Sequence, residues 1–268
     1  MADDQKTSRY SQLGEGSSLL GNLAVVGAIA LLWWVATDQA WVKPLFLPKP
    51  SRVWQAFLQA VSGELDNATL LTHFGWSMFR VFLAFALAAL IGIPIGIAMG
   101  VSRVARGIFD PPIEFYRPLP PLAYLPLMII WFGIDEKPKI ILIFLACFAP
   151  VALAARSGVR AASQEQINAV LSMGASRWQV VRHVILPAAL PELLVGLRIG
   201  MGVGWTTLVA AEMVAATAGL GQMVLNASNF LRTDVVILGI LIIGFVAYTF
   251  ELLMRFLERW LVPWKGRA

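Results

Sequence analysis

The chain has 268 residues, of which 58% are hydrophobic and only 14% are charged. A soluble domain usually has about 45–50% apolar and about 25% charged residues, so this composition excludes an ordinary soluble protein and indicates a polytopic membrane protein. The formal net charge is +5, but the basic residues stand at the ends of apolar runs and form no dense stripe, which argues against a nucleic-acid-binding surface.

The first predicted transmembrane helix follows a polar tail over residues 1–18, whose Lys6 and Arg9 indicate the cytoplasmic side. Residues 19–36 form an apolar run that would cross roughly 27 Å at about 1.5 Å per residue, and it ends in Trp33-Trp34, aromatic residues typical of a membrane interface. A cleaved signal peptide is the alternative, but the run is long for one and no small-x-small cleavage site follows it.

The second predicted span covers residues 78–101, after an external connection that contains a short amphipathic helix over residues 51–61. Gly92, Gly96 and Gly100 recur every four residues within this span. Such a stripe lets another helix approach closely, and a flexible helix without a partner is the alternative.

The third span is expected to be short and irregular. Residues 102–121 carry three arginines, including Arg117, so the positive-inside rule places this connection in the cytoplasm. Four prolines then interrupt residues 118–134. Such an interruption can mark a transport pathway or a packing kink, and the sequence leaves both open. A tight external turn leads to the fourth span, residues 140–155, with an expected bend at Pro150.

A polar helical hairpin over residues 163–187 interrupts the apolar pattern. Ser163 with Gln166, and Ser176 with Gln179, each fit a capping box, so a helix is expected to begin after each serine. Gly174 is placed to end the first helix in a left-handed conformation. An ordinary pair of surface helices would carry the same local signals. The helices have apolar faces, and Pro187 is expected to interrupt the hydrogen bonding of the second: the faces comprise Ile167, Val170 and Leu171, then Val180, Val181, Val184 and Ile185.

The fifth predicted span is residues 192–216. A narrow, slightly polar face follows helical spacing along it, formed by Gly196, Gly200, Gly204, Thr207 and Ala211. This face can line a path or a helix contact. Glu212 is an acid deep in the span, where an ionised carboxylate is expensive unless it faces a cavity or a partner, so a pathway role and a structural hydrogen bond near the external end both stay open.

The sixth predicted span is residues 235–257, where Glu251 and Arg255 are spaced to pair near the inner surface. With both termini inside, the cytoplasmic segments hold thirteen Lys and Arg residues and the external segments hold six. This asymmetry places the hairpin in the cytoplasm.

Several strings resemble the permease subunits of ATP-binding-cassette (ABC) importers. That family carries a cytoplasmic loop with the pattern E-A-A, three residues, Gly, nine residues and I-x-L-P. The strings FYRPLPPLAYLPLMIIWFGI and GVGWTTLVAAEMVAAT are similar to its taurine, aliphatic sulfonate and nitrate branch, and most to taurine permeases. In the loop, Ala169, Gly174, Leu186 and Pro187 match, whereas Asn168, Val170 and Val184 differ.

The resemblance implies an all-α, polytopic membrane protein of the type I ABC importer permease fold, with six transmembrane helices and a cytoplasmic coupling-helix loop. Residues 1–72 would hold the tail, first helix and external connection, residues 73–262 the permease domain, and residues 263–268 a cytoplasmic tail. Partners implied are membrane lipid, a second copy of the chain, two copies of an ABC ATPase subunit, and a periplasmic or lipoprotein substrate-binding protein. The implied location is the inner (plasma) membrane of a bacterium, with both termini cytoplasmic.

In the family, the loop sits in a cleft of the ATPase subunit. The coupling residues that the resemblance implies are therefore Ile167, Asn168, Ala169, Val170, Leu171, Gly174, Ala175, Ser176, Leu186 and Pro187.

Enzyme chemistry has little support, because the sequence lacks a GxxxxGK[ST] phosphate loop, HExxH and GxSxG. Cys147 is the single cysteine, so no disulfide within the chain and no cysteine metal site are expected. We expect no catalytic residue, cofactor or metal, and no nucleic acid partner. A secondary transporter would usually show a repeated half and more titratable groups in its spans, and a membrane enzyme would need a catalytic constellation.

The predicted function is a permease that forms the pathway for taurine or a related sulfonate, with aliphatic sulfonates or nitrate as the alternative. A weakly polar path without mid-membrane Arg or Lys would let such a ligand leave, and Glu212 could meet the amine near the outer mouth. The hypothetical pathway residues are Gly200, Gly204, Thr207, Ala211 and Glu212.

Overall fold

The computed structural model describes residues 19–64 and 68–263. The predicted tail over residues 1–18 and nearly all of the C-terminal tail lie outside this part. The helices within it are α1 (Leu19–Asp38), α2 (Pro50–Ser62), α3 (Leu70–Val101), α4 (Arg103–Tyr116), α5 (Leu125–Phe132), α6 (Glu136–Gly158), α7 (Gln164–Ser172), α8 (Arg177–Val180), α9 (Leu186–Ala215), α10 (Leu220–Asn229) and α11 (Thr233–Leu261). Short turns precede α5 (η1, Pro121–Tyr124) and follow α6 (η2, Val159–Ala161), and a π-helical segment joins α8 to α9 (η3, Val181–Ile185).

The predicted spans correspond to four long apolar helices and two shorter ones. In the described residues, α3, α6 with η2, the run from α8 through α9, and α11 are long and apolar enough to cross a membrane. Shorter apolar helices cover Leu23–Asp38 and Pro121–Phe132, where the first and third spans were predicted. The chain is therefore all-helical over the described residues, as predicted for a polytopic membrane protein.

The core is a packed layer of α3, α6 and α9, in which α6 contacts both of the others extensively. Small residues allow this approach. A Cβ atom on Gly96 of α3 would meet the backbone carbonyl of Ala152 on α6, and one on Gly196 of α9 would meet the Cβ of Ala154, also on α6. The two predicted glycine stripes thus pack against the same central helix, which confirms a close helix contact for both.

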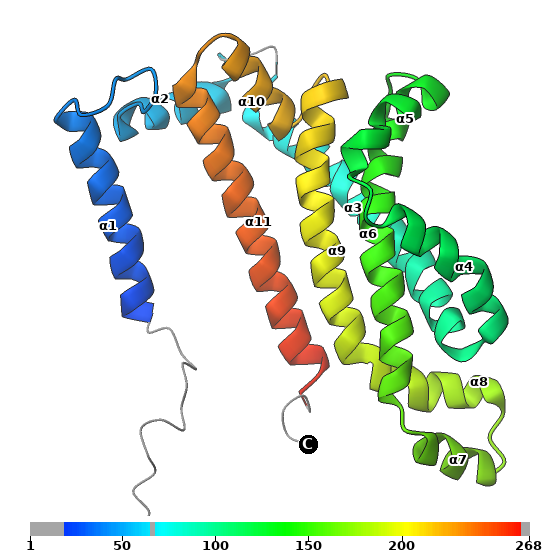
Figure 1. Cartoon of the computed structure of the whole chain (residues 1–268). Helices are drawn as coiled ribbons and strands as arrows, with labels where there is room; N and C mark the ends of the chain where they lie inside the picture. The colour runs from blue at the N-terminus through cyan, green and yellow to red at the C-terminus, as the bar shows by residue number, and fades with distance from the viewer. Residues whose placement is uncertain (1–18, 65–67, 264–268) are drawn as a thin grey trace, which may run out of the picture.

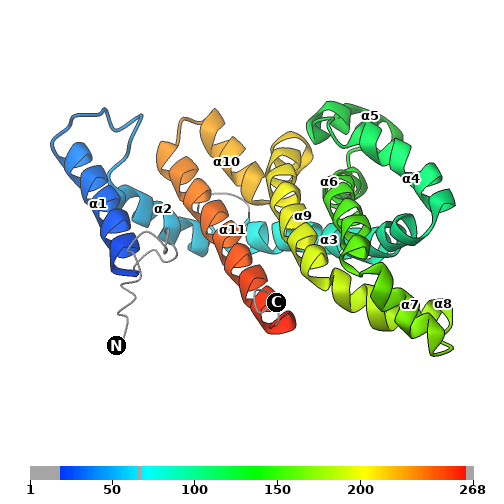
Figure 2. The ribbon, with the colours of Figure 1, turned by 60° about the horizontal axis from the view of Figure 1, so that its bottom comes forward.

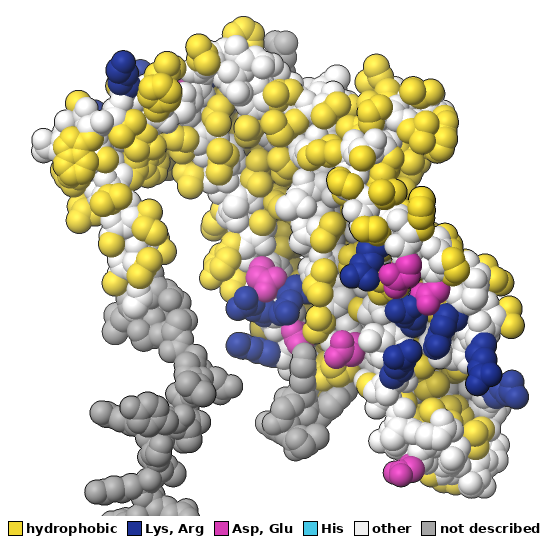
Figure 3. Space-filling model, in the orientation of Figure 1, with side chains coloured by type: hydrophobic (Ala, Val, Ile, Leu, Met, Phe, Trp, Pro, Cys, Tyr) yellow, Lys and Arg dark blue, Asp and Glu magenta, His cyan; other side chains and the backbone are white. Residues whose placement is uncertain are grey.

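The hairpin lies at one end of the molecule, which we call the hairpin end (Figure 1). Helices α2, α5 and α10 lie at the opposite end, and α1 stands apart from the α3, α6 and α9 layer in both ribbon views (Figures 1 and 2). On the face drawn in Figure 3, Lys and Arg side chains gather toward the hairpin end. This distribution agrees with the side that the positive-inside rule assigns to the hairpin.

The structure departs from the predicted elements most clearly at three places. Helix α3 begins at Leu70 and not at residue 78, because Thr69 caps it by accepting a hydrogen bond from the Thr72 amide at 3.3 Å. Residues 102–121, predicted as a plain connection, contain α4, whose Asp110 pairs with Arg156 on α6. The external connection after the fifth span contains α10, which the sequence analysis did not predict.

The expected interruption at Pro187 takes the form of a π-helical segment. Proline has no N–H and its ring crowds the preceding turn, so the helix must adjust just before it. Segment η3 widens the backbone there, and α8, η3 and α9 follow one another without a loop, with Pro187 in the first turn of α9. The second hairpin helix therefore continues directly into a membrane span.

Candidate functional site

Both capping boxes that the sequence predicted are present in the hairpin. The Ser163 hydroxyl accepts from the Gln166 amide at 3.2 Å, and the Gln166 side chain accepts from the Ser163 amide at 3.1 Å. Ser176 and Gln179 form the same reciprocal pair, with the Ser176 amide donating to Gln179 Oε1 at 2.7 Å. These bonds fix where α7 and α8 begin.

The corner between α7 and α8 depends on Gly174. Its φ angle is +84°, a conformation that side-chain-bearing residues rarely adopt, and its amide donates to the Leu171 carbonyl at 2.9 Å. A Cβ atom there would meet no other atom within 4 Å. The glycine is thus required by the backbone conformation and not by a lack of space.

The inner face of the hairpin packs on the ends of the long helices. Ile167, Val170 and Ala175 join a cluster with Val159, Val180 and other residues of η2, η3 and α3. This cluster packs the hairpin against the membrane-spanning layer. The remaining predicted coupling residues are exposed on the outer face or at the start of α9: Asn168, Ala169, Leu171, Gly174, Ser176, Leu186 and Pro187.

The outer face of the hairpin exposes large apolar side chains. Leu171 is 43% exposed, Met173 85% and Trp178 70%. Met173 and Trp178 were absent from the predicted coupling residues. A signal for them was present, because both are apolar and neither belongs to the apolar helix faces that the sequence predicted. An exposed apolar patch of this kind on a polar helical hairpin indicates a surface that another protein covers.

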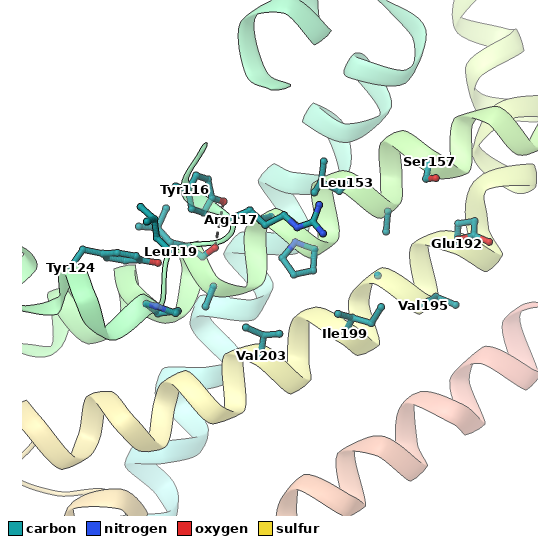
Figure 4. Close-up of a pocket in the computed structure, with 17 residues that line it drawn as sticks. Tyr116, Arg117, Leu119, Tyr124, Leu153, Ser157, Glu192, Val195, Ile199 and Val203 are labelled. Atoms are coloured by element: carbon teal, nitrogen blue, oxygen red, sulfur yellow. Dashed lines mark hydrogen bonds between the residues drawn. The ribbon is translucent and has the colours of Figure 1, made fainter. Parts of the chain in front are cut away.

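A groove of about 510 Å³ runs between α6, α9 and the segment from the end of α4 through η1 (Figure 4). The wall formed by α9 is apolar at Val195, Ile199 and Val203 and carries Glu192 near the start of the helix. The other wall carries hydroxyl groups and a charge, and the close-up in Figure 4 shows Tyr116, Arg117 and Tyr124 grouped on it. The groove thus combines a smooth apolar side with a polar side, an arrangement that can pass a small polar solute.

The predicted pathway face of α9 does not coincide with this groove. Gly200 and Gly204 face Cys147 on α6, Thr207 donates to the Val203 carbonyl of its own helix at 2.8 Å, and Ala211 and Glu212 are fully buried. Gly196 of the predicted face also lines the groove, but Val195, Ile199 and Val203 precede Gly196, Gly200 and Gly204 by one position, which is about 100° around the helix. For this surface, the structure favours the helix-contact alternative.

Glu212 lies in a buried polar cluster at the end opposite the hairpin. Its carboxylate accepts from Ser77 Oγ at 2.8 and 2.9 Å, from Arg80 Nη1 at 2.8 Å, and from the Gly221 amide at 2.9 Å. The carboxylate is 0% exposed. These contacts and this burial favour the structural hydrogen-bond alternative for Glu212.

Arg80 extends this cluster to α6 and to the loop after α9. It donates to Glu136 at 2.5 and 2.9 Å and to the Ala218 carbonyl at 2.6 Å, and its side chain is 1% exposed. Lys139 completes the cluster by donating to Glu136 at 2.8 Å and to the Ala215 carbonyl at 3.1 Å. We refer to Ser77, Arg80, Glu136, Lys139 and Glu212 as the buried ion cluster.

Most of this cluster was not predicted from the sequence. Arg80 lies inside the second predicted span, residues 78–101, and Lys139 directly precedes the fourth, residues 140–155, so neither was identified as part of a cluster with Glu212. A usable signal was present, because a lone arginine and a lone acid within different spans are stable in a membrane only when they pair.

A model of the family described as "Binding-protein-dependent transport system inner membrane component" matches residues 92–266. The chain is 55% identical over 250 residues to the taurine transport system permease protein TauC of Escherichia coli (strain K12), covering 93% of this chain and 90% of that protein. It is 35% identical over 245 residues to the putative aliphatic sulfonates transport permease protein SsuC of Bacillus subtilis (strain 168), covering 91% and 87%.

A more distant similarity is 32% identity over 187 residues to the bicarbonate transport system permease protein CmpB of Synechococcus elongatus, covering 69% of this chain and 67% of that protein. Among solved structures, a chain of the methionine ABC transporter MetNI in an inward-facing conformation superposes with a TM-score of 0.59. That match has 21% sequence identity and covers 72% of this chain and 95% of the other, so it supports the fold.

Proposed function

The chain belongs to the family of binding-protein-dependent transport system inner membrane components, and from this premise we propose that it forms the taurine pathway of an ATP-driven importer. The assignment of taurine as the substrate rests on the 55% identity to TauC over 93% of the chain. The aligned region includes both the hairpin and the groove. Taurine is a zwitterion with a sulfonate at one end and an ammonium at the other. The chain is a transport component and not an enzyme, and ATP hydrolysis belongs to a separate subunit.

The groove between α6, α9 and η1 is proposed as this chain's share of the translocation pathway. It replaces the small-residue face of α9, which is occupied by α6. The groove is open along one side of the isolated chain, so a second copy facing it would close the path. We propose a pair of permease chains with two ATPase subunits at the hairpin end and a substrate-binding protein at the opposite end, both termini being cytoplasmic.

The outer face of the hairpin is proposed as the contact with the ATPase. The exposed Leu171, Met173 and Trp178 provide apolar area that water would otherwise surround. Because η3 and α9 continue directly from α8, a movement of the hairpin is transmitted to the helix that forms one wall of the groove.

Uptake of labelled taurine by the purified complex in proteoliposomes is expected to require ATP, the ATPase and the binding protein together. A complex whose ATPase cannot hydrolyse ATP serves as the control. Native mass spectrometry of the same preparation should give two permease chains per complex. Uptake of an alkanesulfonate or of nitrate in place of taurine would contradict the substrate while leaving the family membership intact.

Replacing Gly174 by valine is expected to impair the association or stimulation of the ATPase without preventing insertion of the permease. A β-branched residue at a φ of +84° costs on the order of 1–3 kcal/mol, which distorts the corner that presents Met173. ATPase co-purification and taurine-stimulated hydrolysis measure the effect. Gly174→Asn is the matched control, because asparagine tolerates the left-handed conformation; a Gly174→Val complex that assembles and transports like the wild type would refute the assignment.

A further inference from the structure

Two side chains of opposite charge line the groove. Among the residues that line it, Arg117 and Glu192 are the charged ones, and the remaining lining is apolar or carries the hydroxyls of Tyr116, Tyr124 and Ser157. The sequence alone placed Arg117 in a cytoplasmic connection and predicted no basic residue along the path. The structure brings Arg117 to the groove because the end of α4 reaches α6, where the Tyr116 hydroxyl donates to the Leu145 carbonyl at 3.4 Å.

The two charges stand at different points along the groove. Figure 4 shows Arg117 near the centre and Glu192 nearer the hairpin end, with Leu153 and Val195 between them. Arg117 comes directly after α4, and Glu192 lies in the second turn of α9. A solute that moved toward the hairpin end would therefore pass the arginine first and the glutamate second.

Both charged groups remain accessible. The Arg117 side chain is 58% exposed, and its contact with Glu114 is long, at 3.8 Å. Glu192 is exposed and has no ion pair with any residue in the described part of the chain. An ionised carboxylate within a membrane span is expensive unless it faces water or a partner, so the groove supplies the polar surroundings that Glu192 requires.

We propose that Arg117 and Glu192 are successive recognition points for the two ends of a zwitterionic amino sulfonate. The Arg117 guanidinium presents a planar set of donors that suits a sulfonate, and the Glu192 carboxylate accepts from the ammonium group. This inference rests on the proposed function, and it assigns selectivity for the amine to the permease in addition to any selectivity of a binding protein.

The two contacts are weak enough for the solute to bind and then leave each of them. Both contacts lie at accessible sites, where water competes with the solute for the charged groups and weakens each contact. A sulfonate without an amine would bind Arg117 but would leave Glu192 without its partner as it passed.

The test compares Arg117→Gln and Glu192→Gln in the complete complex with the permease, ATPase and binding protein. We expect taurine uptake in proteoliposomes to fall about tenfold in each variant, corresponding to about 1.4 kcal/mol, while complex yield and ATPase stimulation stay at wild-type values. Transported taurine per hydrolysed ATP therefore falls. Glu192→Asp should retain most of the uptake because it keeps the charge, and Arg117→Lys should retain part of it because lysine keeps the charge but lacks the planar set of donors.

Arg103→Gln and Glu64→Gln are matched controls, because each removes an exposed charge outside the groove. Wild-type taurine uptake in both groove variants would overturn the inference, as would a loss of complex yield that paralleled the loss of uptake. A wild-type complex that takes up an alkanesulfonate and no taurine would overturn the proposed function and this inference together. This outcome is distinct from the others because the unmodified protein itself does not transport taurine.

Discussion

Replacing Glu212 by glutamine is expected to remove most of the folded complex from the membrane, although the substitution changes few atoms. The carboxylate is fully buried and accepts from Ser77, Arg80 and the Gly221 amide, which are all donors. A glutamine side chain would turn an NH₂ group toward some of these donors and would leave Arg80 with one acid in place of two. Removing one partner of a buried ion pair costs about 3–5 kcal/mol, a large fraction of the about 5–15 kcal/mol that usually separates folded from unfolded protein.

The measurement is the yield and thermal stability of the complex purified in detergent. Glu251→Gln is the matched control, because Glu251 pairs with Arg255 at 2.8 Å and with Arg198 at 3.9 Å, and all three side chains are partly exposed, at 33%, 58% and 34%. Such a pair contributes about 0–1 kcal/mol, so the control should stay near wild-type stability. A Glu212→Gln complex with normal yield and stability but no taurine uptake would restore the pathway role for this carboxylate.

Alanine at Gly96 is expected to lower the thermal stability of the permease by separating α3 from α6. The added Cβ would overlap the Ala152 carbonyl oxygen and the Ala155 Cβ, and a backbone atom cannot move aside alone. Forcing an extra group into a packed interior typically costs about 1–3 kcal/mol.

The same substitution at Gly75 provides the control on the same helix. A Cβ atom there would meet nothing within 4 Å, and alanine favours a helix over glycine by about 0.8–1.0 kcal/mol. Gly75→Ala should therefore keep or slightly raise the unfolding temperature of the complex. Equal stability of the two variants would show that the glycine stripe is not what sets the distance between α3 and α6.

Local signals in the sequence determined much of the architecture. Apolar runs predicted the membrane class, because a chain with this composition cannot leave its surface in water. Hydrogen bonds between residues three positions apart determined both hairpin helices, so Ser163 and Ser176 were correctly placed as caps. Gly174 was predicted in the left-handed conformation for the same reason, since a helix end is a local property of the backbone.

Helical spacing predicted which residues of α9 share a face, but it did not predict what lies opposite that face. Gly200 and Gly204 were correctly grouped on one face, and in the structure they lie against Cys147 of α6. A face of small residues suits a close helix contact and a narrow channel equally well, and only the position of the neighbouring helix distinguishes them.

The tertiary structure alone decided the partners of the charged residues. Glu212 is 132 positions from Arg80 in the chain, and Arg117 lies in the groove because the end of α4 and η1 meet α6 in the folded chain. Composition and spacing determine whether a segment enters the membrane and which way its surfaces point, because these depend on neighbouring residues. The energy of a buried charge depends on the groups within a few ångströms of it, and these come from distant segments that meet only when the helices pack.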